Sequence, residues 1–357
     1  MIRNYFVEFA VSVSMLLFGA CSQNANTSRN ELFKILNAEK TGITFTNLLH
    51  ESDSLNIFTY LYYYNGGGVA IGDINNDSLP DIYFSGNETD NKLYLNKGNM
   101  HFQDITEEAG VRCHGAWSTG VSMVDVNGDG LLDIYVCEVK RWSGAGSSNQ
   151  LYINNGNLTF TESAHQFGLD FSGWATQAVF FDYDRDGDLD CFLLNHSVKD
   201  PEQFKPSNIT REAFDAMSGD RLYENRNGYF QDVTRKSGIY SSPVGFGLGV
   251  DVGDVNRDGW PDLYVGNDFH ENDYLYINNQ DGTFREVIAQ STGHTSNFTM
   301  GVAIADINND ALPDILSLDM KPEDDLTYKL SGVWENFNIY NFKHSFGYHH
   351  QSSRNAL

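Results

Sequence analysis

The stretch DVNGDGLLD, residues 125–133, decides the fold of this chain, because side chains that carry oxygen stand at its first, third, fifth and ninth positions. The pattern returns as DINNDSLPD at 73–81, DYDRDGDLD at 182–190, DVNRDGWPD at 254–262 and DINNDALPD at 306–314. A single Asp-Gly pair would indicate only a turn between two strands. Five copies with Asp or Asn at all four positions need a further cause.

Calcium is the ion that this pattern predicts. Concentrated carboxylates repel one another unless a cation neutralises them. Calcium accepts about six to eight oxygen ligands in irregular geometry, whereas magnesium demands a tighter octahedron and prefers to keep water. We expect up to five Ca2+ ions, held by side chains at positions one, three, five and nine and by the carbonyl of position seven. The predicted side-chain ligands are Asp73, Asn75, Asp77, Asp81, Asp125, Asn127, Asp129, Asp133, Asp182, Asp184, Asp186, Asp190, Asp254, Asn256, Asp258, Asp262, Asp306, Asn308, Asp310 and Asp314.

The flanking residues exclude the EF-hand, which needs Glu at position twelve of its loop and a helix on each side. Position twelve holds Phe84, Val136, Leu193, Val265 and Ser317. Short apolar and β-branched runs precede and follow each loop, so each loop joins two strands. Gly at position six permits a positive φ. Ser78 and Ala311 replace that glycine in the first and fifth loops, which are therefore the weaker candidates.

Further repeats lie between the acidic loops, at 91–106, 149–163, 220–234 and 273–287, and each predicts strand, Asn/Gly-rich turn, strand. Together with the strands around each loop, every unit has four strands. The loops begin at residues 73, 125, 182, 254 and 306, so their spacing is 52, 57, 72 and 52 residues. Such a period is typical of propeller blades. The longest interval contains an insertion at 196–219, in which we expect a short helix near its end.

The acidic loops between apolar strands, together with the LY-x-N…G…F pattern of 91–106 and its copies, resemble FG-GAP/VCBS repeats. Such repeats build the β-propeller of integrin α-subunits and of many exported bacterial proteins. The layout also resembles the repeat region of ASPIC/UnbV-domain lipoproteins, the cartilage acidic protein-like group, although no ASPIC/UnbV domain is visible here. The resemblance covers residues 32–357 and implies an all-β propeller of four-stranded blades with calcium loops between first and second strands.

The ends of the repeat region indicate an incomplete ring. Asn355-Ala356-Leu357 matches the opening of a third strand, and ELFKIL at 31–36 resembles a fourth strand that precedes any first strand. We expect four blades and part of a fifth, truncated at the C-terminus. The alternative is a five-bladed ring with a degenerate last blade.

The N-terminus predicts export. Residues 1–20 contain a run of about ten apolar or small residues, which fits a signal peptide and is too short to span a membrane. LFGAC at 17–21 resembles a bacterial lipobox, so Cys21 is the predicted lipidation site and 21–31 the tether. An ordinary signal peptide is the alternative. We expect an exported bacterial lipoprotein at the outer membrane or cell surface, which contacts the membrane through its lipid anchor only.

Charge and cysteine content narrow the partners. With 48 acidic and 23 basic residues the formal net charge is −25, which disfavours nucleic acid as a partner. Cys113, Cys137 and Cys191 form no CxxC pair, so we expect them to pack in the core rather than to bind zinc.

No motif of nucleophilic, phosphate-binding or metalloprotease chemistry occurs, so we predict no catalytic residue and expect a surface module that binds a glycan or a protein. The alternatives are a lyase-type propeller enzyme acting on polysaccharide and a structural spacer of a larger surface protein. Because loops alternate between the two faces of a propeller, the variable loops lie opposite the calcium loops. The candidate ligand residues on that face are Lys140, Arg141, Trp142, Trp117 and Trp174. The tyrosine-rich run YLYYYN at 60–65 is predicted to pack in the core.

Overall fold

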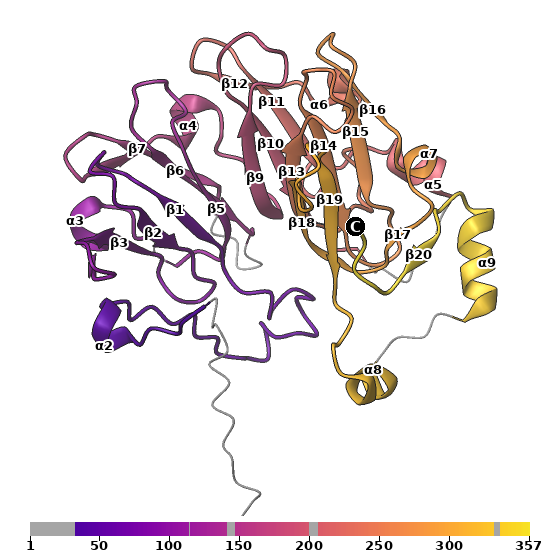
Figure 1. The fold of residues 1–357 in the computed structure, drawn as a ribbon, viewed down its shortest axis with the longest axis horizontal. Coiled ribbons are helices and arrows are strands. Elements are labelled where there is room, and N and C mark those ends of the chain that lie inside the picture. The colour runs from indigo at the N-terminus through magenta and orange to yellow at the C-terminus, as the bar shows by residue number, and fades with distance from the viewer. Residues whose placement is uncertain (1–32, 114, 141–146, 200–205, 332–335) are drawn as a thin grey trace, which may run out of the picture. The chain divides into compact units, whose positions relative to one another are not determined.

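The computed structural model describes residues 33–113, 115–140, 147–199, 206–331 and 336–357 (Figure 1). The chain divides into two compact units, residues 1–40 and 41–357. The predicted signal peptide, Cys21 and the whole tether lie outside the described residues, and so do Arg141 and Trp142. Where the structure describes the chain, no helix has both the length and the apolar character that crossing a membrane requires.

The second unit contains antiparallel sheets in which four successive strands pair in chain order. The first sheet holds β1 (Val69–Gly72), β2 (Asp81–Phe84), β3 (Lys92–Asn96) and β4 (Phe102–Asp104), and the second holds β5 (Ser118–Val124), β6 (Asp133–Glu138), β7 (Gln150–Asn154) and β8 (Phe160–Glu162). The third sheet holds β9 (Ala175–Phe181), β10 (Asp190–Asn195), β11 (Arg221–Asn225) and β12 (Phe230–Asp232). The fourth holds β13 (Gly247–Gly253), β14 (Asp262–Asn267), β15 (Tyr274–Asn278) and β16 (Phe284–Glu286). A fifth sheet holds β18 (Thr299–Ala305) and β19 (Asp314–Asp319). The sheets are blades of a β-propeller, as the repeats predicted, and no ladder among the described residues joins the first sheet to the last.

The first strand of each blade lies beside the first strand of the next, so β1, β5, β9, β13 and β18 are the innermost strands. Hydrogen bonds cross between them: Thr119 Oγ1 donates to Ala175 O at 2.8 Å and Thr176 Oγ1 to Gly247 O at 2.9 Å. A Cβ added at Gly120 would lie 2.4 Å from Thr176 O, so glycine is needed where these backbones approach. The small residues of these strands therefore allow the blades to pack around a common axis.

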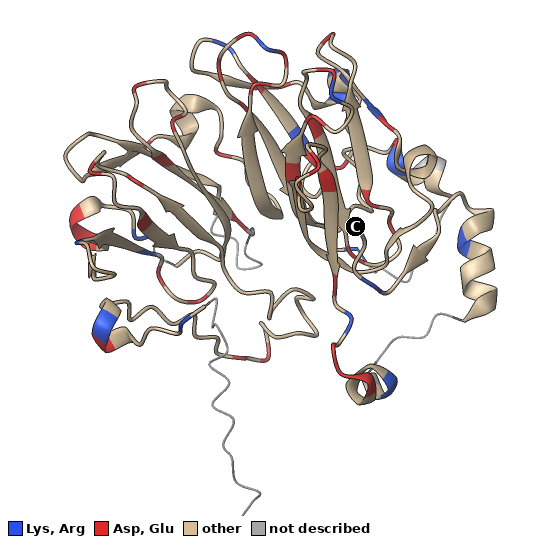
Figure 2. Cartoon of the chain, in the orientation of Figure 1, with Lys and Arg blue, Asp and Glu red and all other residues tan. Residues whose placement is uncertain are grey.

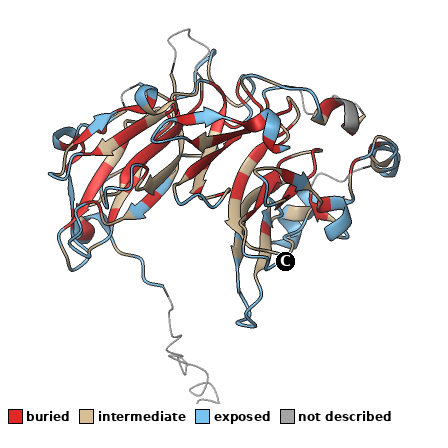
Figure 3. Ribbon diagram, turned by 90° about the horizontal axis from the view of Figure 1, so that it is seen from above, coloured by how far each residue is buried: buried red, intermediate tan, exposed pale blue. Residues whose placement is uncertain are grey.

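The core lies between adjacent blades (Figure 3). In the first three blades the residue two places after the last Asp of the acidic loop illustrates this, since Tyr83, Tyr135 and Phe192 are fully buried. Cys137 and Cys191 are buried free thiols, which confirms their predicted packing in the core, whereas Cys113 is a free thiol that is only half-buried.

Short helices follow the fourth strands: α3 (Thr106–Ala109), α4 (Ala164–Phe167), α6 (Thr234–Ser237) and α7 (Ile288–Ser291). The first three end on glycines with φ of 76°, 77° and 79°. Helix α2 (Ala38–Thr41) likewise precedes Gly42, with φ of 79°. Residues 33–37 form no strand, so the prediction of a fourth strand at 31–36 is wrong for the residues that the structure describes. The helix and glycine that follow the fourth strands of the blades are nevertheless present here. A fourth strand needs a third strand to pair with, and residues 33–37 pair with no strand among the described residues.

The 196–219 insertion contains a short helix as expected, α5 (Ser207–Arg211), but it lies in the middle of the insertion rather than near its end. Beyond β19 the chain forms α8 (Asp325–Ser331) and α9 (Phe337–Ser345), and β20 (Gln351–Ser352) pairs in parallel with β17 (Thr295–Ser296). Ala356 then bridges to Ser317. The Asp319 amide donates to Asn355 Oδ1 as the Gly86 amide donates to Asn91 Oδ1, so the match of 355–357 to a third strand is confirmed in register.

Candidate metal centre and the opposite face

The five acidic loops share one backbone conformation. Positive φ values recur at position four, from 59° to 73°, in Asn76, Gly128, Arg185, Arg257 and Asn309. They recur at position six, where Ser78 has φ 69° and Ala311 has φ 66°, beside 85°, 99° and 86° at the three glycines. The first and fifth loops therefore keep the shape of the others despite their non-glycine residues, at a cost in backbone strain.

The carboxylate at position one organises the loop by accepting backbone N–H groups. In the second loop Asp125 Oδ1 accepts from the Asp129 amide at 3.0 Å and Oδ2 from the Gly130 amide at 2.8 Å. The same two bonds form at Asp73, Asp254 and Asp306. This pattern curls the backbone around the first carboxylate, which brings the other oxygen-bearing side chains toward it.

The carboxylate at position nine is buried and accepts from two sides. In the second blade Asp133 Oδ2 accepts from the Val126 amide at 3.1 Å, and Oδ1 from the amide of Asn154, at the end of the third strand, at 2.8 Å. The same arrangement occurs at Asp81, Asp190 and Asp262. Position nine therefore ties the loop to its blade, a role that the spacing of oxygen ligands did not predict.

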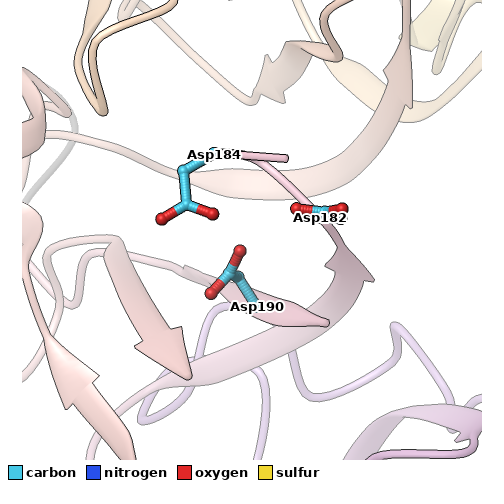
Figure 4. Close-up of side chains that lie close together, drawn as sticks. All are labelled: Asp182, Asp184 and Asp190. Carbon is cyan, nitrogen blue, oxygen red and sulfur yellow. The ribbon is translucent and has the colours of Figure 1, made fainter. Parts of the chain in front are cut away.

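The third loop brings carboxylates closest together. Carboxylate oxygens of Asp182, Asp184 and Asp190 all lie within 4.8 Å of one another, and Figure 4 shows the carboxylates of Asp184 and Asp190 facing each other beside Asp182. Oδ1 of Asp182 is buried and has no hydrogen-bond partner among the described residues. Asp186, the predicted ligand at position five, is not part of this cluster. A buried carboxylate oxygen without a donor, beside two other carboxylates, fits a hard cation.

Burial and like charge make these carboxylates costly to ionise without a cation. Burial, followed by the charges of Asp184 and Asp188, raises the pKa of Asp190 to about 8. Burial first, then Asp129 and Asp125, raises the pKa of Asp133 to about 6. The pKa of Asp184 is also raised, mainly by burial and then by Asp186. All of these shifts favour a positive ion at the loops.

In the other four loops position three is asparagine. Asn75 Oδ1 accepts from the Asp77 amide at 3.2 Å, and its Nδ2 donates to Asp77 Oδ2 at 3.1 Å. Asn127 and Asn256 make the same pair of bonds to Asp129 and Asp258. The residues at positions one, three and five thus lie together in these loops, and an all-oxygen set results when the amide oxygen faces the ion.

The opposite face carries the second-to-third-strand loops and the blade-to-blade connections, because the strands of each blade alternate in direction. Trp117 and Trp174 lie there, just before β5 and β9, and both are buried. They pack in one cluster with Tyr60, Tyr62 and Phe246. Lys140 is half-buried, directly before residues 141–146, which lie outside the described part of the chain, and its amide donates to Gly173 O at 2.7 Å.

The tyrosine run lies across the ends of several innermost strands. Tyr60, Tyr62 and Tyr63 are buried, which confirms their predicted packing role, and Tyr64 is exposed. The Tyr60 hydroxyl lies 3.0 Å from His196 Nε2, in the third blade. The Tyr62 hydroxyl donates to Asp268 Oδ2, beyond the end of β14, at 3.1 Å. Residues 57–65 therefore connect the third and fourth blades from one side; we call them the tyrosine strap.

A cavity of about 740 Å³ lies beside the tyrosine strap. Its lining includes Tyr62, Trp117, Gln177, His196 and Met300, from the strap and from successive blades. Sequence reasoning missed it, because its walls come from segments far apart in the chain. The tyrosine run beside Gly66-Gly67-Gly68, which also line it, was the one local signal.

Acidic residues recur in every blade, whereas Lys and Arg are sparse (Figure 2).

A family model described as FG-GAP-like repeat matches residues 73–136, 142–193, 213–265 and 254–317. Cartilage acidic protein 1 of Xenopus tropicalis is 27% identical over 203 residues, 57% of this chain and 29% of that protein. The Mus musculus protein of the same name is 29% identical over 206 residues, with the same coverage. The chain thus spans under a third of the length of these relatives. The chain also matches a solved structure of the Photorhabdus luminescens Tc holotoxin pore with a TM-score of 0.25 and 13% identity, over 69% of this chain and 13% of that one.

Proposed function

This chain belongs to the FG-GAP-like repeat family, and from that premise we propose that it is a calcium-binding recognition module of the cell surface. Its ligand, a glycan or a protein, binds on the propeller face opposite the acidic loops. The chain reaches the surface as a lipoprotein anchored through Cys21.

One observation carries the calcium proposal: carboxylate oxygens of Asp182, Asp184 and Asp190 lie within 4.8 Å of one another, with a buried oxygen of Asp182 that accepts no hydrogen bond from any described residue. Positions one, three, five and nine of each loop would hold the ion. A bound calcium ion would supply the positive charge that offsets repulsion among these carboxylates. The carboxylates are held in place by the backbone N–H groups that donate hydrogen bonds to them.

The first test is thermal unfolding with calcium and with excess chelator. Binding to the native state alone adds about 2.7 kcal/mol per site at a hundredfold excess of calcium over Kd, so chelation should lower the Tm by many degrees. Unfolding curves that coincide in calcium and in chelator would overturn the calcium proposal.

The cavity beside the tyrosine strap supports the choice of ligand face, since it combines aromatic walls with the amide of Gln177. Aromatic rings with polar groups nearby suit the flat faces and hydroxyls of sugars. Lys140, Arg141 and Trp142 remain the proposed ligand residues of a loop on the same face, where a basic pair would attract an acidic ligand.

A glycan panel tests this part, with retention and depolymerisation both measured. Arg141→Ala and Trp142→Ala should each weaken binding by about 1–3 kcal/mol without altering calcium-dependent unfolding. Tyr229→Ala is the matched control, because Tyr229 is an exposed aromatic residue in the β11–β12 turn, on the calcium-loop face. If both variants bind normally and the Tyr229→Ala control loses binding, the ligand binds on the calcium-loop face and the proposed face is wrong. Retention of surface proteins without any glycan would identify a protein ligand, and a shortened glycan would identify an enzyme.

A Cys21→Ser variant tests the anchor. The lipoprotein proposal predicts an unprocessed or soluble product, and mass spectrometry that finds a mature N-terminus elsewhere without acyl chains would contradict it.

A further inference from the structure

The asparagine that ends the third strand contacts two acidic loops in the second blade. The Asn154 amide donates to Asp133 Oδ1, in the loop of its own blade, at 2.8 Å. Its side-chain Nδ2 donates to the carbonyl of Ile74, in the loop of the first blade, also at 2.8 Å, and this bond is buried. Asn154 therefore joins the first acidic loop to the second.

The fourth blade repeats this arrangement. The Asn278 amide donates to Asp262 Oδ1 at 2.9 Å, and Asn278 Nδ2 donates to the carbonyl of Tyr183, in the third loop, at 2.8 Å. Ile74 and Tyr183 occupy the same place, position two of their loops. The third acidic loop is thus joined to the fourth as the first is to the second.

The third blade breaks the series. The Asn225 amide donates to Asp190 Oδ1 at 2.8 Å, but its Nδ2 donates to Leu189 O, within its own blade, at 3.2 Å. No bond from Asn225 to the second loop occurs among the described residues. Because the other contacts of Asn225 match those of Asn154, the two residues differ mainly in the bond between blades.

Contacts between position-four residues and the next loop show the same pairing. Asn76 Nδ2 donates to the carbonyl of Gly130 at 3.1 Å, from the first loop to the second. The Arg185 guanidinium lies 5.4 Å from the ring centroid of Trp260, from the third loop to the fourth. Two independent contacts therefore join each pair.

We propose that the acidic loops bind calcium as two coupled pairs, the first with the second and the third with the fourth. The inference rests on the calcium binding proposed above. The amide of each position-two residue donates to the position-nine carboxylate of its own loop, as Ile74 does to Asp81 at 3.0 Å. Its carbonyl holds the asparagine of the next blade. An ion that orders one loop fixes the position of that carbonyl and of the asparagine bonded to it. The partner loop then loses less conformational entropy when it binds its own ion.

Calcium titrations followed by hydrogen exchange of individual loop peptides test the coupling. Asp77→Ala, which disables the first loop, should raise the calcium concentration that half-protects 125–133 by about fivefold or more. Protection of 254–262 should respond to calcium as in the unaltered protein. In the Asn154→Ala background the effect of Asp77→Ala on 125–133 should disappear, whereas in the matched Asn225→Ala background it should persist.

The second pair gives an independent arm: Asp184→Ala, which removes a carboxylate of the third-loop cluster, should weaken protection of 254–262, and Asn278→Ala should remove that effect. Far-ultraviolet circular dichroism checks that each variant folds. An unchanged 125–133 response to Asp77→Ala, equal weakening of all loops, or coupling that survives Asn154→Ala would overturn the pairing while calcium binding stands. Calcium-independent exchange at every loop would overturn the proposed function as well.

Discussion

The hydroxyl of Tyr264 donates a hydrogen bond to Oδ2 of Asp273, 2.8 Å away, inside the fourth blade. In the first blade the same place is held by Asn91, whose Nδ2 donates to Tyr83 Oη and to Ser118 Oγ, both at 3.1 Å. The fourth blade thus uses a carboxyl group where the first uses a neutral amide. Burial raises the pKa of Asp273 to about 7.

This relationship predicts a pH dependence of stability. A carboxyl whose folded pKa is raised to about 7 keeps its proton in the folded state between about pH 4 and 7, where the unfolded chain has released it. Its contribution to stability therefore falls as pH rises through that range. Asp273→Asn should make the decline in Tm from about pH 5 to 8 shallower than in the unaltered protein. Parallel pH profiles for the two proteins would contradict this assignment.

Backbone strain at position six predicts that glycine stabilises the fifth loop. Ala311 has φ 66°, a left-handed conformation that costs a residue with a Cβ about 1–2 kcal/mol. Ala311→Gly should raise the free energy of unfolding by up to about 1 kcal/mol, since glycine also gains freedom in the unfolded chain. Gly130→Ala, at the same position of the second loop, should lower it. Denaturant unfolding measures both, and an Ala311→Gly variant less stable than its parent would refute the strain.

Charge crowding in the third loop predicts an effect that depends on calcium. Asp182→Asn removes one negative charge from the cluster with Asp184 and Asp190. The variant should melt lower than the unaltered protein in calcium, because a ligand is lost. In chelator that deficit should vanish or reverse, because repulsion is relieved. A deficit of equal size in both conditions would mean that Asp182 acts only through the backbone.

The tyrosine strap predicts a contrast between two neighbouring hydroxyls. Tyr62→Phe leaves the buried Asp268 carboxylate without its side-chain donor and should cost about 1–3 kcal/mol of stability in urea unfolding. Tyr64→Phe, at an exposed residue whose partner Glu51 is also exposed, should cost almost nothing. Equal effects of the two substitutions would show that the strap does not depend on the Tyr62 bond.

The repeats predicted the blades because each contains its own strands, turn residues and acidic loop within a short stretch of chain. Contacts between blades were not predictable in this way. Asn154 and Asn225 occupy the same place in the repeat, yet only the first bonds to a neighbouring loop. The cavity beside the tyrosine strap also escaped prediction, since its walls come from Tyr62, Trp117 and Met300, which meet only in the folded chain. Ser78 keeps the positive φ that glycine has in three other loops, with its amide donating to Asp73 Oδ2, but the weaker calcium binding expected of this loop stays a prediction.

Calcium binding by the five loops is most directly measured by isothermal titration of the metal-free protein with calcium, combined with equilibrium dialysis to count bound ions. The account predicts saturable binding of several ions, up to one for each of the five acidic loops, and one fewer in Asp182→Asn. If the folded protein binds no calcium at about 1 mM, the concentration at which the weakest extracellular calcium modules bind, then calcium binding by the loops is contradicted.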